Sequence, residues 1–562
     1  MENSALADHF SLLSRLSEIH GENSFKAKSY ATASFNIEKL PMPLNGMQEQ
    51  KIAALQGIGA STAQKISELL QTGRLASLDA LLQKTPQGIL EMMNIKGIGP
   101  KKISAIWKEM GIETIGELRY ACEENRLKDY KGFGEKTQQT ILENITYYQQ
   151  HQGHFLYAQI ESFALELTEK LRALLPGMRL KPCGAIERHL ETIDELEWVT
   201  DTHPDTIRKV FLGMGGFTPL QPQAPDENSL RFQCEPGISI RIHCSGTTSY
   251  PELCYRKSCS PEFASFFESR FGNNHLIASE DAADLFAAAG VPYIPPIARE
   301  ADILEDLLSG KELPEHLTPE SIRGIIHCHS NWSDGSDPLE KMAEAAKEKG
   351  YDYMVISDHS KSAFYANGLQ EERIAAQHRQ IDELNARLTP FRIFKGIECD
   401  ILNEGQLDYA PEVLCTFEVV IASIHSNLSM TEDKAMMRLL RAIENPYTTI
   451  LGHLTGRLLL SRKGYPVDHR RIIDACAANG VAIELNANPS RLDIDWRHIR
   501  YALSKGVMLS INPDAHHIAG FEDTRYGVLV AQKALLQASQ NLSSHSLAGF
   551  EAYLEKAHRK RP

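Results

Sequence analysis

The sequence predicts a multidomain chain with a helical N-terminal part, a mixed α+β middle part and a C-terminal parallel α/β barrel. At roughly 150 residues per domain, 562 residues make about four domains. A Gly-apolar-Gly turn recurs three times in residues 1–150, each time before an amphipathic helix. Seven short apolar runs alternate with helical stretches in residues 322–520. The hydrophobic content of 42% and charged content of 23% are those of an ordinary folded protein.

Several features exclude whole classes of protein. The chain has no run of about 18 apolar residues, so we expect no membrane span. Its N-terminus lacks a basic stretch followed by an apolar one, so we expect no secretory signal. The ten cysteines are scattered without a Cys-x-x-Cys pair, which argues against a zinc ribbon and a disulfide scaffold. We therefore expect a cytoplasmic protein with no membrane or secreted partner.

The net charge of −14 at first argues against nucleic-acid binding, but the charge is uneven along the chain. Residues 1–150 hold 17 Lys and Arg and 17 Asp and Glu, so this part is neutral and the acidic excess lies in residues 151–562. Because binding surfaces are local, the acidic total does not exclude an N-terminal DNA-binding region.

The three glycine turns resemble helix-hairpin-helix motifs. Glycine lets the backbone approach a phosphate closely, and the N-terminus of the next helix offers unpaired N–H groups. One copy alone would be explained by a helix-capping turn, but three copies favour non-specific binding to the DNA backbone. The copies are Leu55–Gly59, Ile95–Gly99 and Tyr130–Gly134, and the candidate DNA-binding residues are Gly57, Gly59, Gly97, Gly99, Lys101, Lys102, Gly132 and Gly134.

The middle of the chain gives weaker signals. Leu196–Thr200 and Ile238–His243 have the pattern of strands. The proline-rich Pro292–Pro296 cannot continue a helix and predicts a loop that leads out of a domain. Residues 301–320 are typical of a linker.

The C-terminal part has the clearest regularity, because each apolar run ends in polar residues. Seven strand-then-helix units predict a parallel α/β barrel, and such barrels place their chemistry at the carboxyl ends of the strands. The predicted strands are Gly324–His329, Tyr353–His359, Ile393–Glu398, Val419–His425, Ile450–His453, Val481–Asn486 and Val507–Asp514.

Nine histidines and carboxylates close these strands or open the loops after them. His327 and His329 are two apart on a strand and therefore share a face, and Asp514 and His516 repeat this spacing. A single one could be an ordinary core histidine, but nine on successive strand ends are improbable by chance. The candidate ligands, which would also be the catalytic residues through their metals, are His327, His329, Asp334, His359, Glu398, His425, His453, Asp514 and His516.

Nine ligands are too many for one ion and suit two or three divalent ions. Mixed imidazole and carboxylate ligands favour Zn²⁺, Mn²⁺ or Fe²⁺ over Ca²⁺. Such ions lower the pKa of bound water and hold the oxygens of a phosphodiester during its displacement. Arg457 and Arg491 could bind substrate phosphate oxygens, although structural salt bridges would explain them equally well.

These motifs resemble those of the PHP (polymerase and histidinol phosphatase) family. The chain has His-x-His at 327–329, Ser-Asp-His at 357–359, Gly-x-Glu at 396–398, Ser-x-His at 423–425, Gly-His at 452–453 and Asp-Ala-His at 514–516. The resemblance implies metal binding at the nine positions above and a distorted (β/α)7 barrel.

A wider resemblance, to bacterial family X DNA polymerases, covers nearly the whole chain. It is carried by Gly21–Lys26, Asn445–Tyr447, Gly452–Leu459 and Arg525–Val528. It implies a polymerase-beta-like core followed by a PHP domain. The implied domains are a lyase-like helical domain (1–82), a fingers-like helix-hairpin-helix domain (83–150), an α+β palm (151–248), a thumb-like part (249–305), a linker (306–321) and the PHP domain (322–562).

The palm departs from that family. The family has Asp-x-Asp and a third aspartate, where this chain has Glu195, Glu197 and Ser239. Gly184-Ala185 replaces a Gly-Ser, and the second Gly-Ser is not recognisable in Ser258–Pro261. Two-metal nucleotidyl transfer needs carboxylates that hold Mg²⁺ in near-ideal octahedra, and a serine cannot replace one. The resemblance therefore implies a DNA-holding palm with little or no polymerase activity, Mg²⁺ being the ion that a surviving site would bind.

Lys65 lies eight residues after Gly57, where lyase members of the family can carry a Schiff-base lysine. A solvated helix lysine is the favoured interpretation, since nothing in the sequence indicates the lowered pKa that such a nucleophile needs.

The sequence thus predicts a metal-dependent DNA nuclease or phosphoesterase of DNA repair, acting on gapped, nicked or 3′-ended DNA. The expected reaction is 3′→5′ removal of nucleotides, with 3′-phosphatase action or abasic-site incision as further options. Three alternatives are an active gap-filling polymerase with PHP proofreading, a non-catalytic scaffold that binds DNA ends, and a small-molecule phosphatase. The palm substitutions count against the polymerase, and the complete ligand set counts against the scaffold. The three hairpins would have no use in a small-molecule phosphatase.

Overall fold

The computed structural model describes residues 3–38, 40, 42–55, 57–95, 97–128, 130–150, 153–220, 228–234, 237–245, 250–272, 282–300, 303 and 314–562. The chain divides into two compact units. The N-terminal unit holds Met1–Glu123 and Leu127–Thr146, and the second unit holds Glu124–Arg126 and Tyr147–Pro562. Among the described residues, no helix is both long and apolar enough to span a bilayer.

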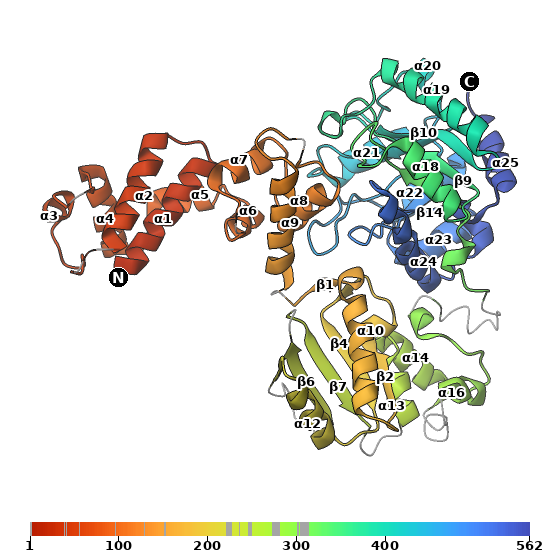
Figure 1. The fold of residues 1–562 in the computed structure, drawn as a ribbon, viewed down its shortest axis with the longest axis horizontal. Coiled ribbons are helices and arrows are strands. Elements are labelled where there is room, and N and C mark those ends of the chain that lie inside the picture. Colours follow the sequence, from red (N-terminus) through yellow and green to blue (C-terminus); the bar gives the residue numbers. More distant parts are fainter. Residues whose placement is uncertain are drawn as a thin grey trace. The chain divides into compact units, whose positions relative to one another are not determined.

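The N-terminal unit is built from helices, as predicted (Figure 1). Each predicted glycine turn ends directly before a helix: Gly59 before α4, Gly99 before α7 and Gly134 before α9. The apolar residues Ile58 and Ile98 are buried, and each anchors its turn. The helices are α1 (Asn3–Ile19), α2 (Ser24–Glu38), α3 (Glu49–Ala53), α4 (Ala60–Thr72), α5 (Ala76–Leu82), α6 (Gln87–Met92), α7 (Pro100–Lys108), α8 (Ile115–Glu123) and α9 (Glu135–Gln150).

A five-stranded mixed sheet, in the order β2-β4-β7-β6-β5, follows in the second unit. Both strands predicted here are confirmed, as β4 (Glu195–Thr200) and β7 (Ser239–Cys244), which pair in parallel. Along each strand, alternate residues face a core with α10 and α12, and the others face α11 and α13. The further elements are β1 (Phe155–Leu156), α10 (Tyr157–Leu174), β2 (Leu180–Cys183), α11 (Gly184–Glu187), β3 (Thr192–Ile193), α12 (Pro204–Met214), β5 (Phe217–Pro219) and β6 (Ser229–Cys234).

The region between this sheet and the barrel is helical and has an aromatic core of its own. It comprises α13 (Tyr250–Lys257), α14 (Pro261–Phe271), α16 (Ala282–Ala288) and the short η1 (Pro296–Ala298). Phe263, Phe267 and Phe286 form its centre. Residues 304–313, which include the first half of the predicted linker (306–321), lie outside the described residues.

The C-terminal part is a seven-stranded parallel sheet in the order β14-β13-β12-β11-β10-β9-β8, so the (β/α)7 prediction is confirmed. The sheet is nearly closed, because Cys328 at the end of β8 forms a parallel bridge with Ala515 after β14, and the His329 amide donates to the Ala515 carbonyl at 2.8 Å. The strands are β8 (Gly324–Cys328), β9 (Tyr353–Ile356), β10 (Arg392–Asp400), β11 (Val419–Ser423), β12 (Ile450–Leu451), β13 (Ala482–Asn486) and β14 (Leu509–Asn512).

Six strands of this barrel are buried along their length, and β10 is buried except at Arg392 and Lys395, as in a sheet covered by helices on its outer face. The helices are α18 (Leu339–Glu348), α19 (Glu371–Leu388), α20 (Pro411–Leu414), α21 (Glu432–Ile443), α22 (His469–Asn479), α23 (Trp496–Ser504), α24 (Thr524–Lys533) and α25 (Leu547–His558), with short helices η3 (Pro319–Ser321), η4 (Phe364–Ala366), η5 (Ile518–Asp523), η6 (Ala538–Gln540) and η7 (Leu542–Ser544).

Ion pairs link the barrel to the middle sheet within the second unit. The fully buried Lys533 of α24 donates to a Glu300 carboxylate oxygen at 2.8 Å and to the Arg188 carbonyl at 2.9 Å. Arg525 at the start of α24 donates to Glu161 of α10 at 2.7 Å. These contacts attach the two parts along α24.

Candidate metal centre

The structure brings all nine predicted ligand residues together at the carboxyl ends of the barrel strands. Eight are buried, and the His425 side chain is 6% exposed. The barrel closes β8 against β14, so residues nearly 190 positions apart in the chain become neighbours. His327 lies in β8 and is followed by His329 and Asp334; His359 follows β9, Glu398 lies in β10, His425 follows β11, His453 follows β12, and Asp514 and His516 follow β14.

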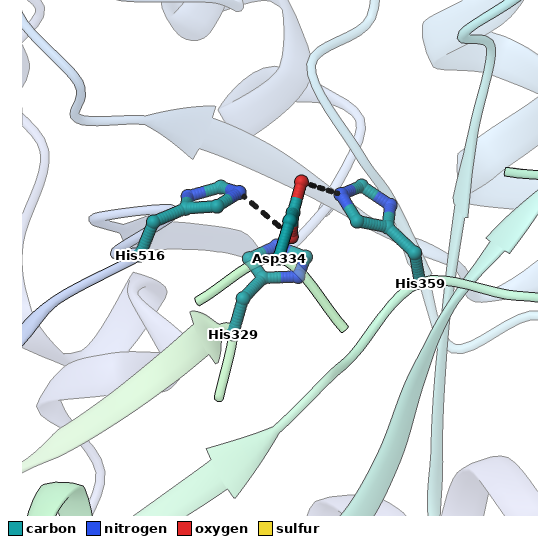
Figure 2. Close-up of side chains that lie close together, drawn as sticks. All are labelled: His329, Asp334, His359 and His516. Atoms are coloured by element: carbon teal, nitrogen blue, oxygen red, sulfur yellow. Dashed lines mark ion pairs between the residues drawn. The ribbon is translucent and has the colours of Figure 1, made fainter. Parts of the chain in front are cut away.

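Three histidines, His329, His359 and His516, lie around the Asp334 carboxylate and form a group of four with it (Figure 2). Asp334 Oδ2 lies 3.5 Å from His359 Nε2, and its Oδ1 lies 3.4 Å from His516 Nε2. The His329 ring stacks between the other two, with ring centroids 4.4 Å from His359 and 4.2 Å from His516. One ligand atom from each of the four lies within 4.8 Å of the others, so the group could hold a metal ion.

The Glu398 carboxylate is the hub of the rest of the cluster. Its Oε1 lies 3.0 Å from His453 Nε2 and 3.1 Å from His425 Nε2, and its Oε2 lies 3.0 Å from His359 Nδ1. Burial would raise the pKa of Glu398, but the imidazoles of His425, His327 and His359 hold it well below its usual range. This carboxylate is therefore placed between two groups of imidazoles, as a bridging ligand would be.

Two ligand positions have an unusual backbone conformation. His327 has φ +63° and Asp514 has φ +53°, both in the left-handed region that residues with a side chain rarely adopt. The β8–β9 register shifts between Ile326 and Cys328. The His-x-His pair is therefore not two alternate residues of a regular strand, as the sequence suggested, because a bulge at His327 directs it to the cluster.

Several buried atoms in this cluster make no hydrogen bond with the described residues. They include His327 Nε2, His359 Nε2, Asp334 Oδ2, Glu398 Oε2 and His516 Nε2. Buried polar atoms are normally satisfied, so a set of imidazole nitrogens and carboxylate oxygens facing one another fits a cation site. Burial, followed by His516 and His359, lowers the pKa of His329 to about 3, which keeps its ring neutral, as a metal ligand must be.

Glu484, which the sequence did not single out, accepts hydrogen bonds from two of the candidate ligands. The fully buried carboxylate accepts from His327 Nδ1 at 2.6 Å and from the His453 amide at 3.1 Å. It also accepts from Asn512 Nδ2 at 2.8 Å and Asn486 Nδ2 at 2.9 Å. Because a carboxylate only accepts, His327 carries its proton on Nδ1 and its Nε2 lone pair is left for the cluster.

Two aspartates support other ligands in the same way. Asp400 of β10, two residues after Glu398, binds His425 Nδ1 and accepts from Ser362 Oγ at 2.7 Å. Asp358 accepts from the amide of Ser330 at 2.8 Å and from Gln377 Nε2 at 2.6 Å. Asp358 thereby fixes the loop that carries His329 and Asp334.

A further carboxylate, Glu124, belongs to the second unit by its contacts. Its Oε2 lies 2.5 Å from His516 Nε2, and together with Asp514 and His516 it forms another group whose ligand atoms lie within 4.8 Å of one another. Burial would lower the pKa of His516, but Glu124 and then Asp334 raise it well above its usual range. No motif in the sequence pointed to Glu124.

The two arginines proposed to bind phosphate have different surroundings. Arg457 donates to Asp495 Oδ2 at 2.6 Å and to the carbonyls of Arg491 and Leu492. Arg491 is 3% exposed, and its Nε lies 3.7 Å from Asp514 Oδ2. Arg491 therefore borders the ligand cluster, whereas Arg457 holds the backbone of the loop that carries Arg491.

In the middle sheet, the three palm positions lie on one face. Glu195 pairs directly with Ser239 across β4 and β7. Glu195 accepts from Arg231 Nε at 2.8 Å, and its other oxygen lies 2.8 Å from Arg241 Nε. Glu197 Oε2 lies 2.7 Å from His243 Nε2, so both carboxylates already have arginine or imidazole partners.

Five of the six glycines in the three turns are exposed, as a close approach to phosphate requires, and Gly134 is half-buried. Gly97, Gly132 and Gly134 have φ of +88°, +93° and +110°, which favours glycine. A Cβ on Gly99 would meet nothing within 4 Å. Lys101 and Lys102 lie in the first turn of α7 and Lys65 lies on α4; the roles of all three remain predictions.

Three family models match parts of the chain. A helix-hairpin-helix domain matches residues 1–75, a SAM-like helix-hairpin-helix tandem matches residues 89–145, and a PHP domain matches residues 326–488. The two helix-hairpin-helix matches cover the three glycine turns. The PHP match covers seven of the nine candidate ligands, from His327 to His453, and ends before Asp514 and His516.

Among curated proteins, the chain is 32% identical over 555 residues to a DNA polymerase/3′-5′ exonuclease PolX of Bacillus subtilis, which covers 96% of this chain and 97% of that protein. A probable phosphatase of Caldanaerobacter subterraneus is 25% identical over 178 residues, 29% of this chain and 63% of its own. DNA polymerase lambda of Rattus norvegicus is 26% identical over 208 residues, 36% of this chain and 32% of its own.

Proposed function

The chain belongs to the bacterial family X DNA polymerases that carry a PHP domain, and from this premise we propose that it is a metal-dependent DNA 3′→5′ exonuclease of DNA repair. Helix-hairpin-helix domains imply DNA binding, and the PHP domain implies hydrolysis of phosphoesters. Release of a 3′-phosphate and incision at abasic sites are further reactions that the same centre could perform.

The observation that carries this proposal is the buried cluster at the barrel's carboxyl ends. It joins nine imidazole and carboxylate side chains, and several of their facing atoms, among them His327 Nε2, Asp334 Oδ2 and His516 Nε2, make no hydrogen bond with the described residues. This donor set suits two or three ions of Mn²⁺, Zn²⁺ or Fe²⁺. Divalent ions held there would make a water more acidic and stabilise the charge of the phosphoryl group under attack.

The protein's own residues would then orient the substrate. We propose that Arg491, which borders Asp514, binds a non-bridging oxygen of the scissile phosphate. Arg457 is better placed to support it, because its guanidinium is committed to Asp495 and to the backbone of residues 491 and 492.

We propose that the glycine turns at Gly57–Gly59, Gly97–Gly99 and Gly132–Gly134 hold the DNA backbone, assisted by Lys101 and Lys102. Their exposure supports this role, and phosphate contacts of this kind carry no base preference. We propose gapped, nicked and 3′-ended DNA as the substrates, because binding of this kind holds one strand by its phosphates.

For the palm we propose a DNA-holding role without nucleotidyl transfer. Arg231 and Arg241 neutralise Glu195, and Ser239 stands where a third carboxylate would be needed to bind Mg²⁺. The alternative is an active gap-filling polymerase with PHP proofreading, which the similarity to a bacterial polymerase favours.

The test is incubation of the full chain with 3′-gapped DNA labelled at the 5′ end, in Mn²⁺, with and without dNTPs. The proposal expects shortening by single nucleotides in both mixtures. Template-directed extension with dNTPs would support the polymerase alternative. If the DNA is neither shortened nor extended, only the interpretation as a DNA-binding scaffold remains.

A further inference from the structure

The loop after β9, residues 360–369, places two aromatic side chains beside the ligand cluster. The loop is closed, because the Leu369 amide donates to the His359 carbonyl at 2.8 Å and Ser360 and Leu369 form a bridge. Ser362 ties it to the cluster, since its Oγ donates to Asp400, which in turn holds His425. The loop is therefore fixed to the supports of the metal ligands.

Phe364, in η4 of this loop, is 83% exposed, the largest exposed fraction of any large apolar side chain among the described residues. Its neighbours Ala363 and Ala366 are buried, at 0% and 1% exposure, so the loop is packed and Phe364 is its one exposed apolar side chain. Phe364 is two positions after Ser362, a Cα–Cα span of at most about 7 Å. The exposed ring is therefore held by a loop that is anchored to a support of the metal ligands.

A lone exposed apolar residue normally needs no explanation. Phe364 differs from such a residue because a packed loop holds it near a candidate phosphodiesterase centre. A DNA substrate of that centre would itself bring an apolar surface that Phe364 could contact. A DNA end presents a nucleobase next to each phosphate, and bases stack on aromatic rings in a sequence-tolerant way.

Tyr365, the next residue, points its polar atom the other way. Its hydroxyl is buried and makes no hydrogen bond with the described residues. Burial chiefly raises the pKa of Tyr365 above its usual range; Arg126, whose guanidinium lies 4.9 Å from the centre of the Tyr365 ring, lowers it, and Asp400, Glu398 and Asp334 raise it. The phenol therefore stays protonated and offers a hydrogen-bond donor in the field of the cluster's carboxylates.

We propose that the 360–369 loop is the nucleotide subsite of the PHP centre, in which Phe364 stacks on the base of the 3′-terminal nucleotide and the Tyr365 hydroxyl donates to a non-bridging oxygen of its phosphate. The inference rests on the proposed exonuclease function. It assigns the base contact to Phe364, so cleavage depends on the presence of a terminal base without depending on which base it is.

The test of the stack compares two DNA ends on the full chain in saturating Mn²⁺, one with a 3′-terminal thymidine and one with a 3′-terminal abasic nucleotide. Phe364→Ala is expected to lower kcat/KM about 5- to 100-fold on the thymidine end and to leave the abasic end unchanged. Phe364→Trp should restore cleavage. Tyr293→Ala, which removes a 46% exposed aromatic side chain from the region between the middle sheet and the barrel, is the matched control and should change neither end.

Loss of the hydroxyl is tested by Tyr365→Phe, with Tyr553→Phe as the control that removes another buried hydroxyl from the same barrel. We expect Tyr365→Phe to lower kcat about 10- to 100-fold, with KM and bound metal unchanged, because the hydrogen bond strengthens as charge builds on the phosphoryl oxygens. Tyr553→Phe should leave kcat unchanged.

Equal effects of Phe364→Ala on both ends, or no effect on either, would overturn the subsite, as would an unchanged kcat in Tyr365→Phe. Failure of the underlying function has a different signature, namely that the unmodified chain cuts neither end, or that His329→Ala cuts as well as the unmodified chain.

Discussion

Replacing Glu484 by glutamine should destabilise the barrel and weaken metal binding together. Each carboxylate oxygen accepts two hydrogen bonds, one pair from His453 and Asn486 and the other from His327 and Asn512. Either orientation of the glutamine amide therefore turns its NH₂ group toward two donors. Each buried donor left unsatisfied costs about 1–3 kcal/mol, so two of them should lower the free energy of unfolding by about 2–6 kcal/mol.

Metal affinity should fall about 10- to 100-fold in the same variant, because His327 would lose the acceptor that fixes its proton on Nδ1. Thermal unfolding of the metal-free chain and equilibrium dialysis with Mn²⁺ measure the two effects. Glu300→Gln is the matched control, since it removes a buried carboxylate whose partners are Arg188 and Lys533. The control should lose stability and keep its metal affinity; a Glu484→Gln chain as stable and as tightly metal-bound as the unmodified protein would refute the reasoning.

Three further predictions concern pH, DNA capture and the palm. Burial raises the pKa of Asp495, but Arg457 and a second arginine lower it to about 2. The charged form therefore adds about 2 kcal/mol to the free energy of unfolding above pH 4, and this contribution is lost as the pH falls to 2. Asp495→Asn should flatten this part of the curve of unfolding free energy against pH. Gly99→Val should weaken binding to DNA of every sequence alike in a fluorescence titration while leaving the fold intact, because a Cβ there meets nothing, and binding by the unmodified chain should fall steeply with salt. In a His329→Ala background, no dNTP incorporation is expected with Mg²⁺ or Mn²⁺, even after Ser239→Asp, and clear primer extension would contradict this.

The barrel could be predicted from the sequence because each of its strands is a short buried run closed by a polar residue. The strands β2 and β5 of the middle sheet were missed, and each contains a proline, Pro182 and Pro219. Proline removes a ladder hydrogen bond and is tolerated at sheet edges, which is where both strands lie. Such strands give no reliable pattern in a single sequence.

The ligand set could also be predicted, whereas its supports could not. The nine ligands follow strand ends, a local signal. Glu484 and Glu124 act through partners 157 and 392 residues away, His327 and His516, and only the closed barrel and the folded second unit define those contacts. Asp400 had a weak signal in the sequence, because it follows Glu398 by two residues and so lies on the same face of β10.

The account's central claim, that the barrel cluster performs the cleavage, is tested most directly by measuring nucleotide release and DNA affinity on the same preparations of His329→Ala and Asp514→Ala. Both residues are buried in the cluster and neither lies in the glycine turns. We predict that Mn²⁺-dependent release of nucleotides from a 3′ end is abolished in both variants while DNA affinity stays within about twofold of the unmodified chain, since metals and DNA are held by different residues. Cleavage at the unmodified rate by both variants would contradict the claim.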